Sequence, residues 1–375
     1  MASRRGKTAL ILAGGGTMGA AYEIGVLSAL ERALRPDFST TRFDMYVGIS
    51  AGAIIATLAA NQISPHLLFR AIANNEQRVF NWKRSDIYRF DFKEVLCCSF
   101  RAVGNFFRIL RHYRERGWSL DLSALQYIFQ EQFPSGLFSL EPMQNYLCNA
   151  FKTEHLLDDF NLIRPELYIP AYDLDLGERV VFGSEGFRDM HICQAITASC
   201  AIPHFFRPCN IHGRHYLDGS TGRAIHLDIA VEQGAELIVL VNPRVPLRND
   251  PEHFCLPSLS FGNCASIADL GISIAQEQAR RIESREKISL TLDRFRDTHP
   301  NIDIVLIEPE REESVFFFQN PMSMTARNHI MAFGYHLTLS QLRTRFSELQ
   351  ETFHRHGITL NPDRLEAPPP VDIHI

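Results

Sequence analysis

Short apolar runs alternate with longer segments of helical character along most of this chain. Residues 8–13, 43–47 and 236–242 are apolar for nearly their whole length. Runs of this kind are typical of strands that are buried on both faces of a parallel sheet. Together with the segments between them, they predict an α/β protein. We expect strands at 8–13, 43–47, 166–175, 179–182, 210–217, 236–242 and 302–307, the third and fourth forming a hairpin.

The intervening segments predict helices, and proline and glycine mark several of their ends. Residues 204–208 read as an apolar loop after a helix that Pro203 stops. No internal repeat or linker divides the chain. We therefore expect one α/β domain over residues 7–345, an N-terminal extension (1–6), an insertion at about 80–120, and a C-terminal helix end with a loose tail (346–375). The helices are expected at 20–30, 53–60, 65–77, 195–203, 265–295 and 323–356.

The sequence Gly48-Ile49-Ser50-Ala51-Gly52 lies between a predicted buried strand and a predicted helix. Strand, G-x-S-x-G and helix together are the context of a nucleophile elbow, in which a strained turn exposes the serine hydroxyl. Glycines at 48 and 52 let neighbouring backbone approach closely. The motif alone is a weak signal, because a glycine-rich strand-to-helix turn has the same pattern. In ordinary α/β-hydrolases several strands precede the elbow, whereas Ser50 follows only the second strand. This position disfavours the ordinary α/β-hydrolase fold.

A second glycine turn follows the first strand. Gly14, Gly16 and Gly19 satisfy G-x-G-x-x-G, which is also the pattern of a dinucleotide-binding turn. That alternative requires an acidic residue at the end of the second strand, and Asp44 lies at its other end. Exposed amides at a helix N-terminus also bind an oxyanion. Because consecutive parallel strands place their following turns side by side, this turn should lie next to the elbow.

Composition excludes several classes of protein. The 375 residues carry a net charge of −5, which argues against general nucleic-acid binding. Eight scattered cysteines without C-x-x-C spacing predict reduced, buried thiols and a cytosolic location, and no metal or cofactor site is expected. No apolar run is long enough to span a membrane. Lys7 and the arginines before it could begin a secretory signal, but three glycines interrupt the apolar stretch.

Residues 83–118 differ from the rest of the chain. Nine Lys or Arg stand there against four acids, with aromatic residues between them. Such a segment could be a lid that contacts an anionic lipid surface, although a solvated basic helix whose aromatics pack on the core is the commoner meaning of such a pattern. The triplet Phe316-Phe317-Phe318 is either core or lipid-facing.

Asp218-Gly219 follows the predicted strand at 210–217. An Asp-Gly pair usually means a turn, but a carboxylate at a strand end could also be a general base. Four ordered blocks now resemble the patatin-like phospholipases of bacterial type: residues 14–19, 48–52, Ala198-Ser199-Cys200-Ala201-Ile202-Pro203, and Asp218-Gly219. Weaker likeness at 171–174 and 320–323 extends the resemblance over residues 7–340.

The resemblance implies a three-layer α/β/α fold with a mostly parallel central sheet and a Ser-Asp dyad that cleaves acyl esters of phospholipids or lysophospholipids without a metal. Ser50 would be the nucleophile and Asp218 the base, beside Gly219. The oxyanion hole would come from Gly14, Gly15, Gly16, Thr17 and Gly19. Two positions depart from the family pattern. The position before the last glycine of the first turn is often basic in the family and is Met18 here, and the position after Gly219 is usually Gly or Ala and is Ser220 here. Because the hole uses backbone amides, Met18 should affect headgroup contacts more than the chemistry.

Two alternatives stay open at this point, and a third is rejected. An aspartate is a weak base towards a serine hydroxyl unless the site is dry, so a Ser-His-Asp triad is a second mechanism. Its histidine would be one of those near Asp218 in the sequence, namely His204, His212, His215 and His226. A catalytically silent lipid-binding or scaffold protein could share the fold. A nucleotide-binding protein is disfavoured by the missing ribose-binding acid.

Overall fold

The computed structural model describes residues 6–34, 36–76, 84–87, 89–90, 107–108, 111–117, 134–250, 252, 255–256, 262–313 and 324–371. The strands are β1 Thr8–Leu12, β2 Met45–Gly48, β3 Arg89–Phe90, β4 Gly136–Ser139, β5 Glu166–Asp173, β6 Glu178–Phe182, β7 His204–Phe206, β8 Cys209–Ile211, β9 Arg214–Leu217, β10 Leu237–Val241 and β11 Asp303–Ile307. The helices are α1 Gly16–Leu34, α2 Ala51–Ala60, α3 Pro65–Ala73, α4 Arg84–Ile87, α7 Glu141–Thr153, α8 Ile192–Ser199, α9 Leu227–Glu232, η1 Ile267–Leu270, α10 Ile272–Thr298, α11 Met324–Thr344, α12 Phe346–Arg355 and η3 Pro362–Arg364.

An eight-stranded sheet forms the centre of the molecule, in the order β11-β10-β1-β2-β5-β9-β8, with β6 also paired to β5. The first five strands of that order are parallel, and β6, β9 and β8 join in antiparallel fashion. Leu12 pairs with both Gly48 and Val241. Three parallel strands therefore end at one level, and the turns that follow them come together at that edge.

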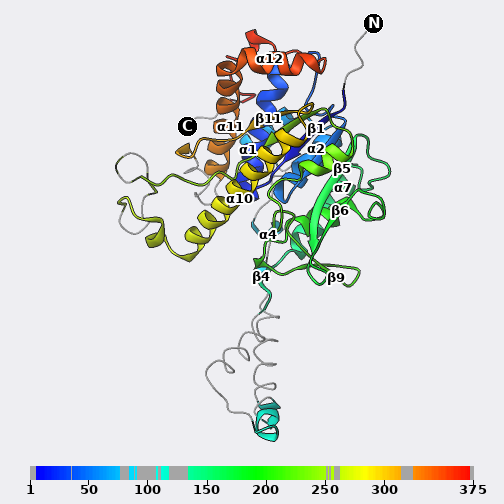
Figure 1. Ribbon diagram of the computed structural model, residues 1–375, viewed down its shortest axis with the longest axis vertical. Coiled ribbons are helices and arrows are strands. Elements are labelled where there is room, and N and C mark those ends of the chain that lie inside the picture. Colours follow the sequence, from blue (N-terminus) through cyan, green and yellow to red (C-terminus); the bar gives the residue numbers. More distant parts are fainter. Residues whose placement is uncertain are drawn as a thin grey trace.

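Helices cover both faces of this sheet, as Figure 1 shows. Alternate residues of β1 enter two separate cores: Leu10 and Leu12 pack with α1, α2, α8 and α11, whereas Ala9 and Ile11 pack with α9 and α10. This alternation follows from the two-residue repeat of a strand. The predicted three-layer α/β/α fold with a mostly parallel central sheet is confirmed.

Several predicted elements are divided in the structure. The expected strand at 210–217 is a hairpin of β8 and β9, because His212 (φ 52°) and Gly213 (φ 81°) turn the chain. Gly271 (φ 91°) separates η1 from α10 within the expected helix at 265–295. The expected helix at 323–356 breaks at Arg345, between α11 and α12.

A small second sheet was not predicted. It has the order β3-β4-β7, and β7 occupies the stretch that was expected to be a loop after Pro203. Phe138 of β4 stacks against Phe205 of β7 with ring centroids 4.7 Å apart. β4 and β9 lie at the opposite end of the folded body from α12 (Figure 1).

The cysteines correct the expectation of reduced thiols. Cys148 of α7 and Cys193 of α8 form a disulfide, with Cα atoms 5.3 Å apart, and Cys255 is joined to Cys264. The sequence could not show these pairs, because the first depends on how two helices pack. Cys200 and Cys209 are free and buried. The expected cytosolic location, which rested on reduced thiols, loses that support.

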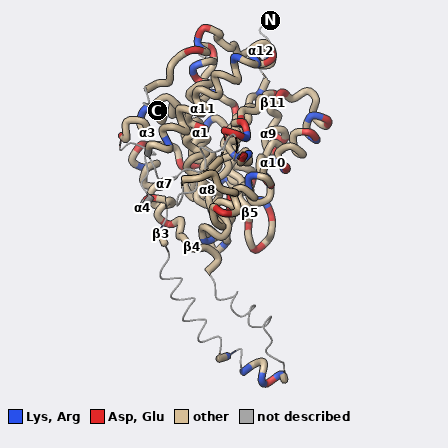
Figure 2. Tube along the Cα trace, turned by 90° about the vertical axis from the view of Figure 1, so that its left-hand side faces the viewer, with Lys and Arg blue, Asp and Glu red and all other residues tan. Residues whose placement is uncertain are grey.

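Most of the basic segment 83–118 and the whole of Phe316-Phe317-Phe318 lie outside the described residues. In its described part, Arg111 and Glu115 form an exposed ion pair. Basic and acidic positions are interspersed along the described chain (Figure 2). Among the described helices, none is both long and apolar enough to cross a membrane.

Candidate active site

Ser50 occupies the turn between β2 and α2 in a conformation that L-residues rarely adopt, with φ 54° and ψ −129°. Backbone strain of this kind costs about 1–3 kcal/mol and persists only where the surroundings impose it. Gly48 and Gly52 make the tight turn possible: a Cβ on Gly52 would lie 2.5 Å from the Leu12 carbonyl oxygen. The Ser50 hydroxyl does not cap α2, so it is not used to stabilise the helix. Ser50 is buried but retains 6% of its surface.

The glycine turn between β1 and α1 contacts the Ser50 turn directly. Gly14, Gly15 and Gly16 all have positive φ, at 76°, 110° and 66°. A Cβ on Gly14 would lie 3.1 Å from the Cβ of Ser50. The predicted contact between the two turns is therefore present, and it follows from the pairing of Leu12 with Gly48.

The amides of this turn divide into two groups. The Gly14 N–H donates to Glu23 Oε1 at 2.8 Å, and the Gly19 N–H donates to the Gly15 carbonyl at 3.1 Å. These two amides are therefore engaged inside the turn. Among the described residues, the amides of Gly15 and Gly16 have no acceptor within hydrogen-bonding distance, and both residues are partly exposed. Thr17, also partly exposed, begins the first turn of α1 beside them.

Asp218 follows β9 and is only 1% exposed. Its Oδ1 accepts hydrogen bonds from the Ser220 N–H (2.8 Å) and the Ser220 hydroxyl (2.7 Å). Its Oδ2 is buried and has no hydrogen-bond partner among the residues that the structure describes. Ser220, the departure from the family pattern, therefore orients the carboxylate and leaves one oxygen able to accept a proton.

The end of α8 joins the Ser50 turn to the Asp218 turn. The Ser199 hydroxyl accepts the Ser50 N–H at 2.9 Å, and the Ser199 carbonyl accepts the Gly219 N–H at 3.2 Å. The Asp218 N–H donates to the Ala201 carbonyl at 2.9 Å. Ser199 and Ala201 thus hold both turns, which follow strands far apart in the sequence.

The Cys200 thiol contacts the Ser50 side chain and lies within electrostatic reach of Asp218. Burial raises its pKa well above the ordinary value, and the negative charge of Asp218 adds to the rise. Its polar contact with the Ser50 side chain acts in the opposite direction. Since such a thiol stays protonated, Cys200 is a packing group here and not a competing nucleophile.

The four histidines near Asp218 do not contact its carboxylate. His226 is fully buried, and its Nε2 lies 2.9 Å from the Gly219 carbonyl oxygen, to which it donates. Burial lowers the pKa of His226 to about 4. His215 bonds to Asn210 and Asp175. Because Asp218 Oδ2 has no partner and Oδ1 is held by Ser220, a Ser-His-Asp triad finds no support in this geometry.

Arg244 brings positive charge to this edge of the sheet. It follows β10, and its Cγ would lie 3.3 Å from a Cβ on Gly15. One guanidinium nitrogen donates to the Ala224 carbonyl at 2.7 Å, and Nε is buried without a partner in the described ranges. Burial lowers the pKa of Arg244, and the negative charge of Asp218 is the largest effect in the opposite direction. This cation thus lies within electrostatic reach of Asp218 and beside the glycine turn, where Met18 supplies no positive charge.

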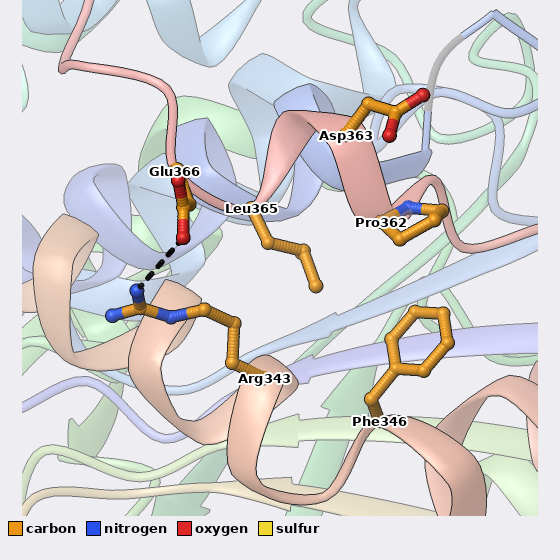
Figure 3. Close-up of a pocket in the computed structure, with 6 residues that line it drawn as sticks. All are labelled: Arg343, Phe346, Pro362, Asp363, Leu365 and Glu366. Carbon is orange, nitrogen blue, oxygen red and sulfur yellow. Dashed lines mark ion pairs between the residues drawn. The ribbon is translucent and has the colours of Figure 1, made fainter.

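A separate cavity of about 450 Å³ is formed by residues of the C-terminal part of the chain, between α11, α12 and η3 (Figure 3). Arg343 and Glu366 form an ion pair of 3.9 Å at its edge, and none of its lining residues belongs to the site around Ser50. Within the described ranges, no three His, Cys, Asp or Glu side chains gather in an arrangement that could hold a metal ion.

Comparison with known families agrees with this arrangement. The sequence pattern described as "Patatin-like phospholipase" matches residues 10–231, more than half of the chain. The chain belongs to the patatin-like phospholipase family. Membership places it among the lipolytic ester hydrolases and accounts for the order of the four sequence blocks. No curated protein matches it in a sequence search.

Solved structures with partial similarity include two bacterial proteins. VipD from Legionella pneumophila is 12% identical, with a TM-score of 0.32, over 94% of this chain and 80% of that one. ExoU from Pseudomonas aeruginosa, in a complex with SpcU of the type III secretion system, is 16% identical, with a TM-score of 0.30, over 95% and 64% of the two chains. A second ExoU–SpcU structure has 16% identity and a TM-score of 0.29, over 98% and 70%.

Sequence reasoning missed three groups at this site. Ser199 was named only as part of a matching block, and its hydrogen bond to the Ser50 amide depends on packing between α2 and α8. Ser220 was noted as a departure, without its bonds to Asp218. Glu23 looked like a helix residue, yet it is 0% exposed, and only its burial distinguishes it from a surface acid.

Proposed function

We propose that this protein is a serine acyl hydrolase that cleaves fatty-acyl esters of phospholipids or lysophospholipids through a Ser50–Asp218 dyad. The observation that carries the proposal is the buried Asp218 carboxylate, whose Oδ2 has no partner among the described residues, on a turn that Ser199 and Ala201 join to the turn of the strained Ser50. Family membership supports the lipid substrate. The choice of dyad and of substrate is our inference.

In the proposed reaction, Ser50 Oγ attacks the ester carbonyl carbon while Asp218 Oδ2 accepts the hydroxyl proton. The oxyanion that forms accepts hydrogen bonds from the free amides of Gly15 and Gly16 at the start of α1, where the helix dipole adds positive potential. Breaking the ester C–O bond returns the proton from Asp218 to the departing alcohol and leaves an acyl group on Ser50.

Water then repeats these steps on the acyl-enzyme. Asp218 takes a proton from water as the water oxygen attacks the acyl carbon. When the tetrahedral intermediate collapses, the bond between the acyl carbon and Ser50 Oγ breaks, Asp218 returns the proton to Oγ, and the fatty acid is released. Because an aspartate is a weak base, the fixed amides and the Arg244 charge must stabilise much of the transition state. The burial of Asp218 and the tight closure around Ser50 support such a water-poor site.

Release of free fatty acid from phosphatidylcholine vesicles and from lysophosphatidylcholine micelles tests the proposal. We expect release by the wild type, and a fall of at least about 10³-fold in Ser50→Ala and Asp218→Asn. Asp175→Asn removes an exposed carboxylate nearby and should keep full activity. A wild type that releases no fatty acid from either lipid would contradict the proposal and favour a silent lipid-binding protein. Asp218→Asn at the wild-type rate would reject the base.

A further inference from the structure

Glu23 is a carboxylic acid that lies wholly inside the protein, two turns into α1. Its side chain is 0% exposed, and Oε1 accepts the Gly14 N–H at 2.8 Å. Its Oε2 has no hydrogen-bond partner in the described part of the chain. Burying an acid with only half of its hydrogen-bonding capacity used costs free energy. Such a group in a native protein calls for an explanation.

The peptide that Glu23 holds is the one where the two turns meet. Gly14 has φ 76°, and its Cα faces the Ile49 carbonyl and the Ser50 Cβ so closely that no side chain fits there. Its N–H is fixed from the other side by Glu23. The next two peptides carry the free amides of Gly15 and Gly16. A rotation of the Gly14 peptide would therefore redirect both proposed oxyanion donors.

The charge state of Glu23 also suits this place. Burial raises its pKa well above the ordinary value, and the Gly14 N–H and Arg244 oppose that rise with smaller effects. Burial thus favours the protonated, uncharged form of this acid, and an uncharged carboxyl behind the turn repels an oxyanion less than a carboxylate would.

We propose that Glu23 is a positioning residue for acyl transfer: it holds the Gly14 peptide so that the Gly15 and Gly16 amides face the carbonyl oxygen of the ester at Ser50. The inference rests on the hydrolase function proposed above. Glu23 never touches the substrate and acts only through the turn.

Glu31 offers a matched control on the same helix. It is also a fully buried glutamate, and its oxygens accept hydrogen bonds from Ser39 and from the Thr40 N–H and hydroxyl. Those partners belong to a loop that leads into the opposite end of β2 from Ser50. Shortening either glutamate to aspartate removes one methylene and withdraws the carboxyl group from its acceptor position.

The kcat and KM of the variants are measured on a soluble p-nitrophenyl ester, normalised to folded protein. Glu23→Asp should lower kcat by roughly 10- to 100-fold and leave KM within about 3-fold of the wild-type value. This is the pattern expected when the oxyanion donors are misplaced but the substrate still binds. Glu23→Gln keeps an oxygen acceptor for the Gly14 N–H and should stay within about 3-fold of the wild type. Glu31→Asp should lose stability without a comparable loss of kcat.

Three kinetic results would overturn the proposal: an unchanged kcat in Glu23→Asp, an equal loss in Glu31→Asp, or a Glu23→Gln variant as slow as Glu23→Asp. If Glu23→Asp does not fold, hydrogen exchange of the wild-type Gly14 amide decides. Strong protection is expected, and exchange at the rate of a free amide rejects the contact. A wild type without esterase activity would instead refute the hydrolase function, and the exchange result would still stand.

Discussion

The hydroxyl of Ser199 should be required for the strained conformation of Ser50. Ser199 is 0% exposed, and its Oγ accepts the Ser50 N–H at 2.9 Å. Ser199→Ala leaves that buried amide without an acceptor, which costs about 1–3 kcal/mol. If the whole cost appears as loss of the productive Ser50 conformation, kcat/KM falls by about 5- to 150-fold, since 1.36 kcal/mol corresponds to tenfold.

Ser28 provides the control, because it is also 0% exposed but its hydroxyl has no hydrogen-bond partner in the described structure. Ser28→Ala deletes the same atom from a buried site without breaking a bond. Thermal unfolding and kcat/KM on a p-nitrophenyl ester are measured for both variants. We expect Ser28→Ala to stay near the wild type, with Ser199→Ala losing a few degrees in Tm and most of its activity. Indistinguishable variants would refute the bridging role of Ser199.

Two further predictions concern stability. In Gly52→Ala the new Cβ meets the Leu12 carbonyl oxygen at 2.5 Å, so we expect the free energy of unfolding in urea to fall by more than about 3 kcal/mol. Gly177→Ala, where the space is open, should lose about 1 kcal/mol. Equal losses would contradict the close packing of the elbow. His226 is neutral when folded, with a pKa lowered to about 4, while the unfolded chain binds its proton below about pH 6.5. Stability should therefore fall by roughly 3 kcal/mol as pH drops from 6.5 to 4, and His226→Asn should remove that part of the slope; an unchanged slope would show that His226 is not the group responsible.

Much of the fold was predictable because its signals are local. The apolar runs at β1, β2, β10 and β11 report strands buried on both faces, and each lies within two residues of its predicted range. The breaks within predicted strands and helices that were missed also have local causes, but their sequence signals are weaker. His212-Gly213 turns the chain through positive φ values, and Gly271 ends η1 in the same way. Glycine alone does not show whether a helix or strand continues past it.

The site was predictable only in part, for a different reason. The glycine patterns around Ser50 and Gly14 identify two turns, and parallel pairing of their strands makes them neighbours. The contacts that hold them come from packing over long sequence separations. Ser199 meets Ser50 across 149 positions, and the disulfide of Cys148 with Cys193 spans 45. No spacing rule in one sequence encodes such pairs.

The central claim is that Ser50 is the nucleophile, and covalent labelling tests it most directly. The wild type and Asp218→Asn are treated with a fluorophosphonate probe, digested, and mapped by mass spectrometry. We expect one modified residue, Ser50, in the wild type, and labelling slowed by at least about 10²-fold in Asp218→Asn because the base is lost. Modification of another serine, such as Ser199 or Ser220, or no modification of a folded wild type, would contradict the account.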